Sequence, residues 1–116
     1  MTRTPQEVFA HHGRAFDAQD VDDILSDFAE DAGVITPAGL KQGKGGIREA
    51  YEQLFAELPH AAFDVKKQVF GDDLLFLEWA ADAGKSRADD GVDTFVFRDG
   101  KIQAQTIHYT LQRKAD

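Results

Sequence analysis

The sequence predicts an α+β fold in which helices come first and an antiparallel sheet follows. The spacing of apolar residues is helical up to Pro59 and alternates with a period of two after it. The pair Asp99-Gly100 also lies between two alternating runs, which is typical of a hairpin turn. We therefore expect helices to cover one face of a curved sheet.

Two helices are expected near the N-terminus. The run Thr4-Pro5-Gln6-Glu7 offers a capping threonine, a proline suited to the first helical position and a glutamate that completes a capping box. A second helix is expected to start at Asp20, with an apolar stripe that extends to Phe28.

The segment before Pro59 predicts a short strand and a third helix. The strand covers 32–36 and is ended by Pro37, and the glycines at 43–46 mark a loop. The third helix covers about 47–58 and has an amphipathic face.

Long strands are expected in the second half, and no linker, repeat or low-complexity segment interrupts the chain. Residues 1–116 are therefore expected to form a single domain. The expected strands cover about 61–70, 74–83, 90–98 and 101–112.

The composition excludes several classes of function. A net charge of −8 on 116 residues disfavours binding to nucleic acid and to anionic membranes. The chain has no cysteine, and no two histidines have metal-binding spacing with a carboxylate, so we expect neither a metal nor another cofactor. Neither a signal peptide nor a membrane-spanning window is evident, so the expected location is cytoplasmic.

Asp93 is the polar residue that stands out, because a period of two places it on one strand face with Phe95 and Phe97. A carboxyl group on an aromatic face is costly to ionise, so it is paired, exposed at a strand end or used in a site. The apolar faces of neighbouring strands form either a packed core or the walls of a pocket. Those faces contain Leu75, Leu77, Trp79 and Ala81 in one strand and Ile107, Tyr109 and Leu111 in another.

The opposite face of the Asp93 strand is semi-apolar. It carries Val92, Thr94 and Val96. Such a surface suits an interface between copies, so we expect a homodimer through the outer face of the sheet.

Spaced motifs run through nearly the whole chain. They are Asp17-x-x-Asp20-x-x-x-Ile24-x-x-x-Phe28-Ala29-x-Asp31-Ala32, Gly43-x-x-x-Ile47-x-x-x-Tyr51, Glu78-Trp79 and Asp93-x-Phe95-x-Phe97-x-Asp99-Gly100-Lys101-Ile102. In these motifs the chain resembles the NTF2-like superfamily, and within it the SnoaL-like and ketosteroid-isomerase-like proteins. The resemblance implies a cone of three N-terminal helices packed on a strongly curved antiparallel sheet, with a pocket at the open end and frequent dimerisation. It implies no single activity, because this fold hosts isomerases, cyclases, dehydratases and non-catalytic domains.

The resemblance also implies roles for individual residues. The protonated, oxyanion-binding aspartate of the isomerases falls on Asp93, the oxyanion-hole tyrosine on His12 and a supporting tyrosine on Tyr51. A second supporting tyrosine falls on Phe28, which has no hydroxyl group. The base that abstracts the substrate proton falls on Thr36, and threonine cannot act as that base at neutral pH. This difference argues against steroid isomerisation by the familiar route.

His12 leaves several arrangements open. It can act as a donor or acceptor in the pocket, or it can point partly to solvent. It can also pair with Asp93, which would raise the pKa of the histidine and lower that of the aspartate. We take both residues as the candidate catalytic groups. The candidate ligand-binding residues are Phe16, Phe28, Thr36, Tyr51, Phe55, Leu77, Trp79, Phe95 and Tyr109.

Three functions remain open from the sequence. The first is an isomerase- or cyclase-type enzyme that acts on a small, apolar carbonyl compound. The second is a non-catalytic domain that binds a small apolar molecule in the same pocket. The third is a dimeric interaction domain with a nearly filled cone. The threonine at the base position favours the last two.

Overall fold

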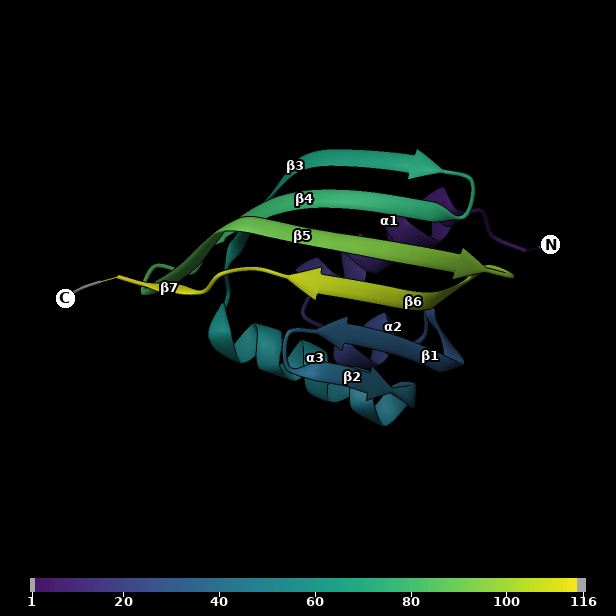
Figure 1. Ribbon diagram of the computed structural model, residues 1–116, viewed down its shortest axis with the longest axis horizontal. Helices are drawn as coiled ribbons and strands as arrows, with labels where there is room; N and C mark the ends of the chain where they lie inside the picture. The colour runs from purple at the N-terminus through teal and green to yellow at the C-terminus, as the bar shows by residue number, and fades with distance from the viewer. Residues whose placement is uncertain (1, 115–116) are drawn as a thin grey trace.

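Three helices pack against one face of a curved seven-stranded sheet in the computed structural model, which describes residues 2–114 (Figure 1). The fold is α+β, as the sequence predicts. The strand order is β2-β1-β6-β5-β4-β3, and the short β7 pairs with β5. In chain order the elements are α1 (Pro5–Asp17), α2 (Val21–Leu25), β1 (Phe28–Thr36), β2 (Gly39–Gln42), α3 (Gly43–Glu57), β3 (Ala62–Gly71), β4 (Leu74–Asp82), β5 (Ser86–Arg98), β6 (Lys101–His108) and β7 (Gln112–Arg113).

The first helix begins where the capping box predicts. The backbone N–H of Glu7 donates to Thr4 Oγ1 at 3.1 Å, and the backbone N–H of Thr4 donates to Glu7 Oε1 at 2.8 Å. These bonds satisfy two donors that a helix N-terminus would otherwise leave unpaired. The helix buries Val8, His12 and Ala15 against the sheet.

The second helix is shorter than its apolar stripe predicts. Asp20 caps it, but the helix ends at Leu25, and Phe28 begins β1 instead of extending the helix. The reason is a tertiary contact, because the carbonyl of Asp27 accepts a hydrogen bond from the backbone N–H of Ile102 in β6 at 2.7 Å. That bond holds Asp27 beside β6, so the chain continues as strand β1 and not as a helix.

The prediction of a loop at the glycines 43–46 is wrong, because α3 already begins at Gly43. A hairpin that the sequence did not reveal precedes it, and β2 of this hairpin pairs with β1. Gly39 makes the turn possible, since its φ of 123° is strained for any residue with a side chain.

The sheet is mixed, although most of its pairs are antiparallel. β3, β4, β5 and β6 form an antiparallel meander, whereas β1 pairs with β6 in parallel. β5 also begins earlier than expected, at Ser86. Register shifts interrupt the β3–β4, β4–β5 and β5–β6 pairs, and such irregularities bend a sheet.

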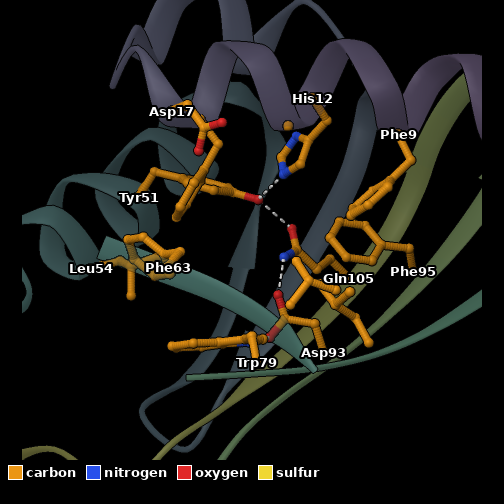
Figure 2. Close-up of a pocket in the computed structure, with 14 residues that line it drawn as sticks. Phe9, His12, Asp17, Tyr51, Leu54, Phe63, Trp79, Asp93, Phe95 and Gln105 are labelled. Atoms are coloured by element: carbon orange, nitrogen blue, oxygen red, sulfur yellow. Dashed lines mark hydrogen bonds between the residues drawn. The ribbon is translucent and has the colours of Figure 1, made fainter. Parts of the chain in front are cut away.

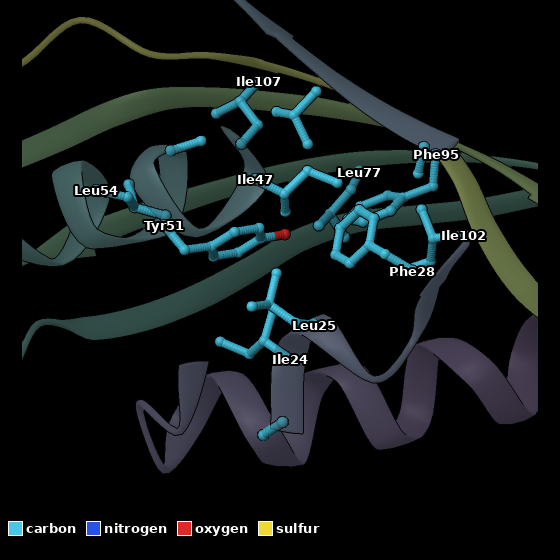
Figure 3. Packing of buried hydrophobic residues seen from close by; sticks show 14 of the residues in the cluster. Ile24, Leu25, Phe28, Ile47, Tyr51, Leu54, Leu77, Phe95, Ile102 and Ile107 are labelled. Atoms are coloured by element: carbon cyan, nitrogen blue, oxygen red, sulfur yellow. The ribbon is translucent and has the colours of Figure 1, made fainter. Parts of the chain in front are cut away.

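The core lies between the helices and the inner face of the sheet (Figure 3). Its largest fully buried side chains include Tyr51, Phe28, Phe95, Ile24, Ile47 and Leu58. Among the helices described, none combines the length and the apolar character that crossing a bilayer requires.

Candidate ligand-binding site

A cavity of about 220 Å³ lies between α1, α3 and the inner face of the sheet (Figure 2). We call it the aromatic cavity, because most of its wall consists of aromatic and aliphatic side chains. It is lined by Phe9, His12, Gly13, Phe16, Asp17, Tyr51, Leu54, Phe63, Val65, Leu77, Trp79, Asp93, Phe95 and Gln105.

A chain of hydrogen bonds crosses this cavity from α1 to β5 (Figure 2). His12 Nε2 lies 3.2 Å from the hydroxyl oxygen of Tyr51, and that hydroxyl donates to Gln105 Oε1 at 2.6 Å. Gln105 Nε2 then donates to Asp93 Oδ2 at 3.0 Å. Trp79 Nε1 donates to the other carboxyl oxygen, Asp93 Oδ1, at 3.0 Å. All five side chains are buried.

The direction of the chain follows from the donors that are available. The single hydroxyl proton of Tyr51 is used by Gln105, so His12 must donate through Nε2–H. Nδ1 of His12 is then an acceptor, and it is buried without a hydrogen-bond partner among residues 2–114.

Burial shifts the pKa of each titratable group in this hydrogen-bond chain, namely Asp93, His12 and Tyr51. It raises the pKa of Asp93 to about 7, although the hydrogen bonds from Trp79 and Gln105 act in the opposite direction. It lowers the pKa of His12 to about 4, so this imidazole is neutral at pH 7. Burial, together with the negative charge of Asp93, raises the pKa of Tyr51 well above its ordinary value.

The direct ion pair between His12 and Asp93 that the sequence left open is not formed. Among the described residues, Tyr51 and Gln105 lie between them in the hydrogen-bond chain. Since the pKa of His12 is lowered rather than raised, the two groups form a neutral relay at slightly acidic pH and not a charged pair.

Seven of the residues expected in the site lie together in the aromatic cavity. They are His12, Phe16, Tyr51, Leu77, Trp79, Asp93 and Phe95. The other four do not line it. Phe28 is a core residue whose ring packs edge-on against His12 and Tyr51, and Phe55 packs behind Phe16.

Thr36 and Tyr109 line a different cavity, of about 400 Å³, which we call the α3–β1 groove. Its other lining residues are Pro37, Ala38, Lys41, Glu49, Ala50, Gln53, Leu54, Glu57, Ile107 and Leu111. Thr36, which the resemblance aligns with the isomerase base, therefore lines a different cavity from Asp93.

Gln105 is a residue of the candidate site that the sequence analysis does not predict. It is 2% exposed and joins Tyr51 to Asp93. Its position two residues before Ile107 places it on the same strand face, so the period of two contained the signal. Helical spacing from His12 and Phe16 likewise brings Phe9, Gly13 and Asp17 to the cavity, and these were also missed. The remaining unexpected lining residues are Leu54, Phe63 and Val65.

Gly91 allows the indole ring of Trp79 to pack against β5 in the wall of the cavity. A Cβ atom on this buried glycine would overlap with the indole ring of Trp79, which faces it in the β4–β5 pair. The absent side chain therefore lets the indole lie flat on the strand and reach Asp93.

Comparisons with known proteins agree with this architecture. The sequence profile of the SnoaL-like domain matches residues 9–105. Among curated proteins, none matches the chain in sequence. An NTF2-like protein of unknown function from Cytophaga hutchinsonii has a similar structure, with a TM-score of 0.76 and 11% identity over 95% of this chain and 93% of the other.

Two further structures are similar in fold. One, from Kribbella flavida, is provisionally assigned as a ketosteroid isomerase; its TM-score is 0.76 and its identity 13%, over 97% of this chain and 82% of the other. The other is TerC, co-crystallised with polyporic acid, with a TM-score of 0.73 and 18% identity over 91% of each chain.

Proposed function

Since the chain belongs to the SnoaL-like domain family, we propose that it binds a small, planar and mostly apolar molecule through an oxygen atom held at Asp93. The proposal rests on one observation, the position of a buried carboxyl group at the polar end of an aromatic cavity.

The hydrogen bonds around Asp93 define what the ligand oxygen must offer. Both protein neighbours, Trp79 and Gln105, donate to the carboxyl group. When Asp93 is protonated, neither neighbour accepts its proton, so that proton is available to a ligand carbonyl. When Asp93 is ionised, its remaining lone pairs accept a proton from a ligand hydroxyl.

The size and walls of the cavity limit the rest of the ligand. Its volume of about 220 Å³ lies below the range of roughly 300–1,000 Å³ that is common for drug-sized ligands. Rings such as Phe16, Trp79 and Phe95 suit a flat apolar body. A molecule of one or two rings fits these limits. The co-crystal of TerC with polyporic acid supports binding of a small organic molecule by a protein of this fold, although it does not bear on the size limit.

A matched pair of probes tests the proposal, with binding measured by calorimetry between pH 5.5 and 8.5. 2-Tetralone offers only an acceptor and should bind more weakly as the pH rises through about 7, where Asp93 loses its proton. 2-Naphthol offers a donor and should bind more tightly over the same range. Asp93→Asn should remove both pH dependences and weaken 2-naphthol by about tenfold or more.

Asp89→Asn is the matched control, because Asp89 is exposed on the same strand as Asp93. This variant should bind both probes like the unmutated protein. If Asp93→Asn binds both probes with unchanged affinity and pH dependence, the proposed site is wrong.

Proton transfer of an isomerase or cyclase type is the second candidate function, and Asp17 favours it. This exposed aspartate lines the same cavity as Asp93, and no hydrogen bond or ion pair among residues 2–114 engages its carboxyl group. Asp17 would supply the second carboxylate, the proton-abstracting base, which Thr36 cannot provide.

Exchange of the α-hydrogens of 2-tetralone in D₂O, followed by NMR, tests this candidate. An enzyme of this type would speed the exchange, and Asp17→Asn would abolish the gain while 2-tetralone still binds. An exchange rate equal to that in buffer would leave binding alone as the function.

A second copy of the chain is the partner that the outer face of the sheet fits. Strand register aligns one row of side chains across the six strands from β2 to β3 in the sheet order, and most of its members are apolar or β-branched and exposed. The row consists of Leu40, Ile35, Thr106, Thr94, Phe76 and Val69. An isologous dimer would cover it.

A further inference from the structure

The aromatic cavity and the α3–β1 groove lie on two sides of one side chain. Leu54 is the one described residue that lines both spaces, and it is 5% exposed. It projects from α3 beside Tyr51 and Phe63 (Figure 2). The two spaces are thus neighbours, and the side chain of Leu54 forms part of the wall between them.

The groove beyond this wall is suited to an apolar group. Ala50, Ile107 and Leu111 contribute aliphatic surface to it. The carboxyl group of Glu57 on its rim is already occupied, since Tyr109 and Gln53 both donate to it. An apolar group that entered the groove would therefore not meet an unpaired carboxyl group at Glu57.

We infer that Leu54 sets the length of the ligand by closing the aromatic cavity against the α3–β1 groove. The inference rests on the proposed function, because it concerns the same Asp93-bound ligand. With the leucine in place, a ligand anchored at Asp93 ends at α3. Without it, the joined space would fall within the range of roughly 300–1,000 Å³ found for larger ligands.

The same wall explains why two residues expected in the site lie outside it. Thr36 and Tyr109 line the groove, so they contact an Asp93-anchored ligand only if that ligand passes Leu54. The chain thus carries an elongated site of two compartments, of which one is closed to the anchored ligand.

Two probes of different length test the inference. 2-Naphthol fits the aromatic cavity, and 6-phenyl-2-naphthol carries an additional ring that needs the groove. Leu54→Ala should raise the affinity for 6-phenyl-2-naphthol relative to 2-naphthol by about tenfold, since the additional ring becomes buried. Binding is measured by calorimetry at pH 8.

Two control variants separate an opened wall from a loosened core. Leu58→Ala truncates another buried leucine near the end of α3 that lines neither space, and it should not change the ratio of affinities. The swap Leu54→Ala/Ala50→Leu opens the wall but moves a leucine side chain into the groove, because Ala50 lies one helical turn away and lines only the groove. It should abolish the gain.

The outcomes distinguish this inference from the proposal on which it rests. If the unmutated protein does not bind 2-naphthol in an Asp93-dependent manner, the proposed function fails first. If it does, and folded Leu54→Ala shows no gain for 6-phenyl-2-naphthol, Leu54 does not set ligand length. Leu54→Val, a smaller truncation, replaces Leu54→Ala if the latter does not fold; it should show a smaller gain of the same sign, and an unchanged ratio would overturn the inference.

Discussion

Asp93 and His12 lie in one cavity, and burial shifts their pKa values in opposite directions. It raises the pKa of Asp93 to about 7 and lowers that of His12 to about 4. Between about pH 4 and 7 the folded protein keeps a proton on Asp93 that the unfolded chain releases, so this group makes folding less favourable as the pH rises. Between about pH 4 and 6.5 the unfolded chain holds a proton on His12 that the folded protein lacks, so folding becomes more favourable as the pH rises. The two effects offset each other.

Replacing either residue should expose the effect of the other. Asp93→Asn should become more stable as the pH rises from 4 to 6.5, and His12→Gln should become less stable from pH 4 to 7. Relative to the unmutated protein, each change should amount to on the order of 3 kcal/mol. Urea denaturation at a series of pH values measures it, with Asp89→Asn as a control that keeps the original profile. Parallel profiles for all four proteins would contradict the assigned shifts.

Gly91 is a second position at which a single substitution tests the packing around Asp93. Gly91→Ala should displace the indole of Trp79 and break its bond to Asp93, because the new methyl group would overlap with the ring. We expect a loss of about 1–3 kcal/mol in the free energy of unfolding and red-shifted emission from this sole tryptophan. Gly45→Ala is the control, since an added Cβ there would meet no atom within 4 Å outside the adjacent backbone of its own helix; it should be neutral or stabilising. Unchanged emission from Gly91→Ala would rule out the proposed packing.

Asp27 acts at the scale of elements, because it joins segments that lie far apart in the sequence. It is 1% exposed, and its carboxyl group contacts Arg3 Nη1 at 3.0 Å and His11 Nδ1 of α1 at 2.6 Å. Its carbonyl accepts from Ile102 in β6. One residue therefore links the N-terminal segment, the first helix and the middle of the sheet.

Asp27→Ala should destabilise the fold by about 2–4 kcal/mol, because it leaves two donors without their buried acceptor. Asp23→Ala removes a carboxyl group that contacts the other nitrogen of His11 at 3.2 Å but is 46% exposed, so its cost should stay below about 1 kcal/mol. Chemical denaturation of both variants measures the difference. Equal losses would mean that Asp27 acts only through local charge.

Local chemistry made some elements predictable and left others hidden. The capping box at Thr4, the cap at Asp20 and the turn at Asp99-Gly100 are short-range devices, and all of them occur in the structure. The apolar stripe predicts that the second helix extends to Phe28, since nothing in the local sequence indicates that the carbonyl of Asp27 accepts a hydrogen bond from Ile102. Long-range pairing overrode the helical pattern there.

The same distinction applies to the candidate site. Alternation correctly brings Leu77, Trp79 and Asp93 to one inner face. No spacing rule reveals a wall between compartments, so the resemblance alone placed Thr36 with Asp93. The sequence does not predict Gln105 in the site, because a polar residue in a strand usually faces solvent.

At the scale of the whole molecule, the outer face of the sheet is the proposed interface between two copies. If it pairs two copies, Phe76→Glu or Val96→Glu should convert a dimer into a monomer, because each would bury a charge in the apolar interface. Analytical ultracentrifugation measures the change. Val65→Glu is the control: Val65 is 52% exposed but pairs with Trp79 and so belongs to the inner face. A monomeric unmutated protein, or dimers that survive both substitutions, would argue against this interface.

The parallel pair of β1 and β6 is a long-range contact with a consequence for folding. It joins 28–35 to 102–106, whereas the meander from β3 to β6 joins strands that follow one another in the chain. Long-range pairing forms slowly, because a long loop must be ordered first. During synthesis β1 therefore cannot pair with β6 until this last long strand has been made. Gln105 lies in that strand, so the hydrogen-bond chain between His12 and Asp93 is completed at the same step that closes the sheet. Closure of the sheet and assembly of the proposed site then depend on the same strand.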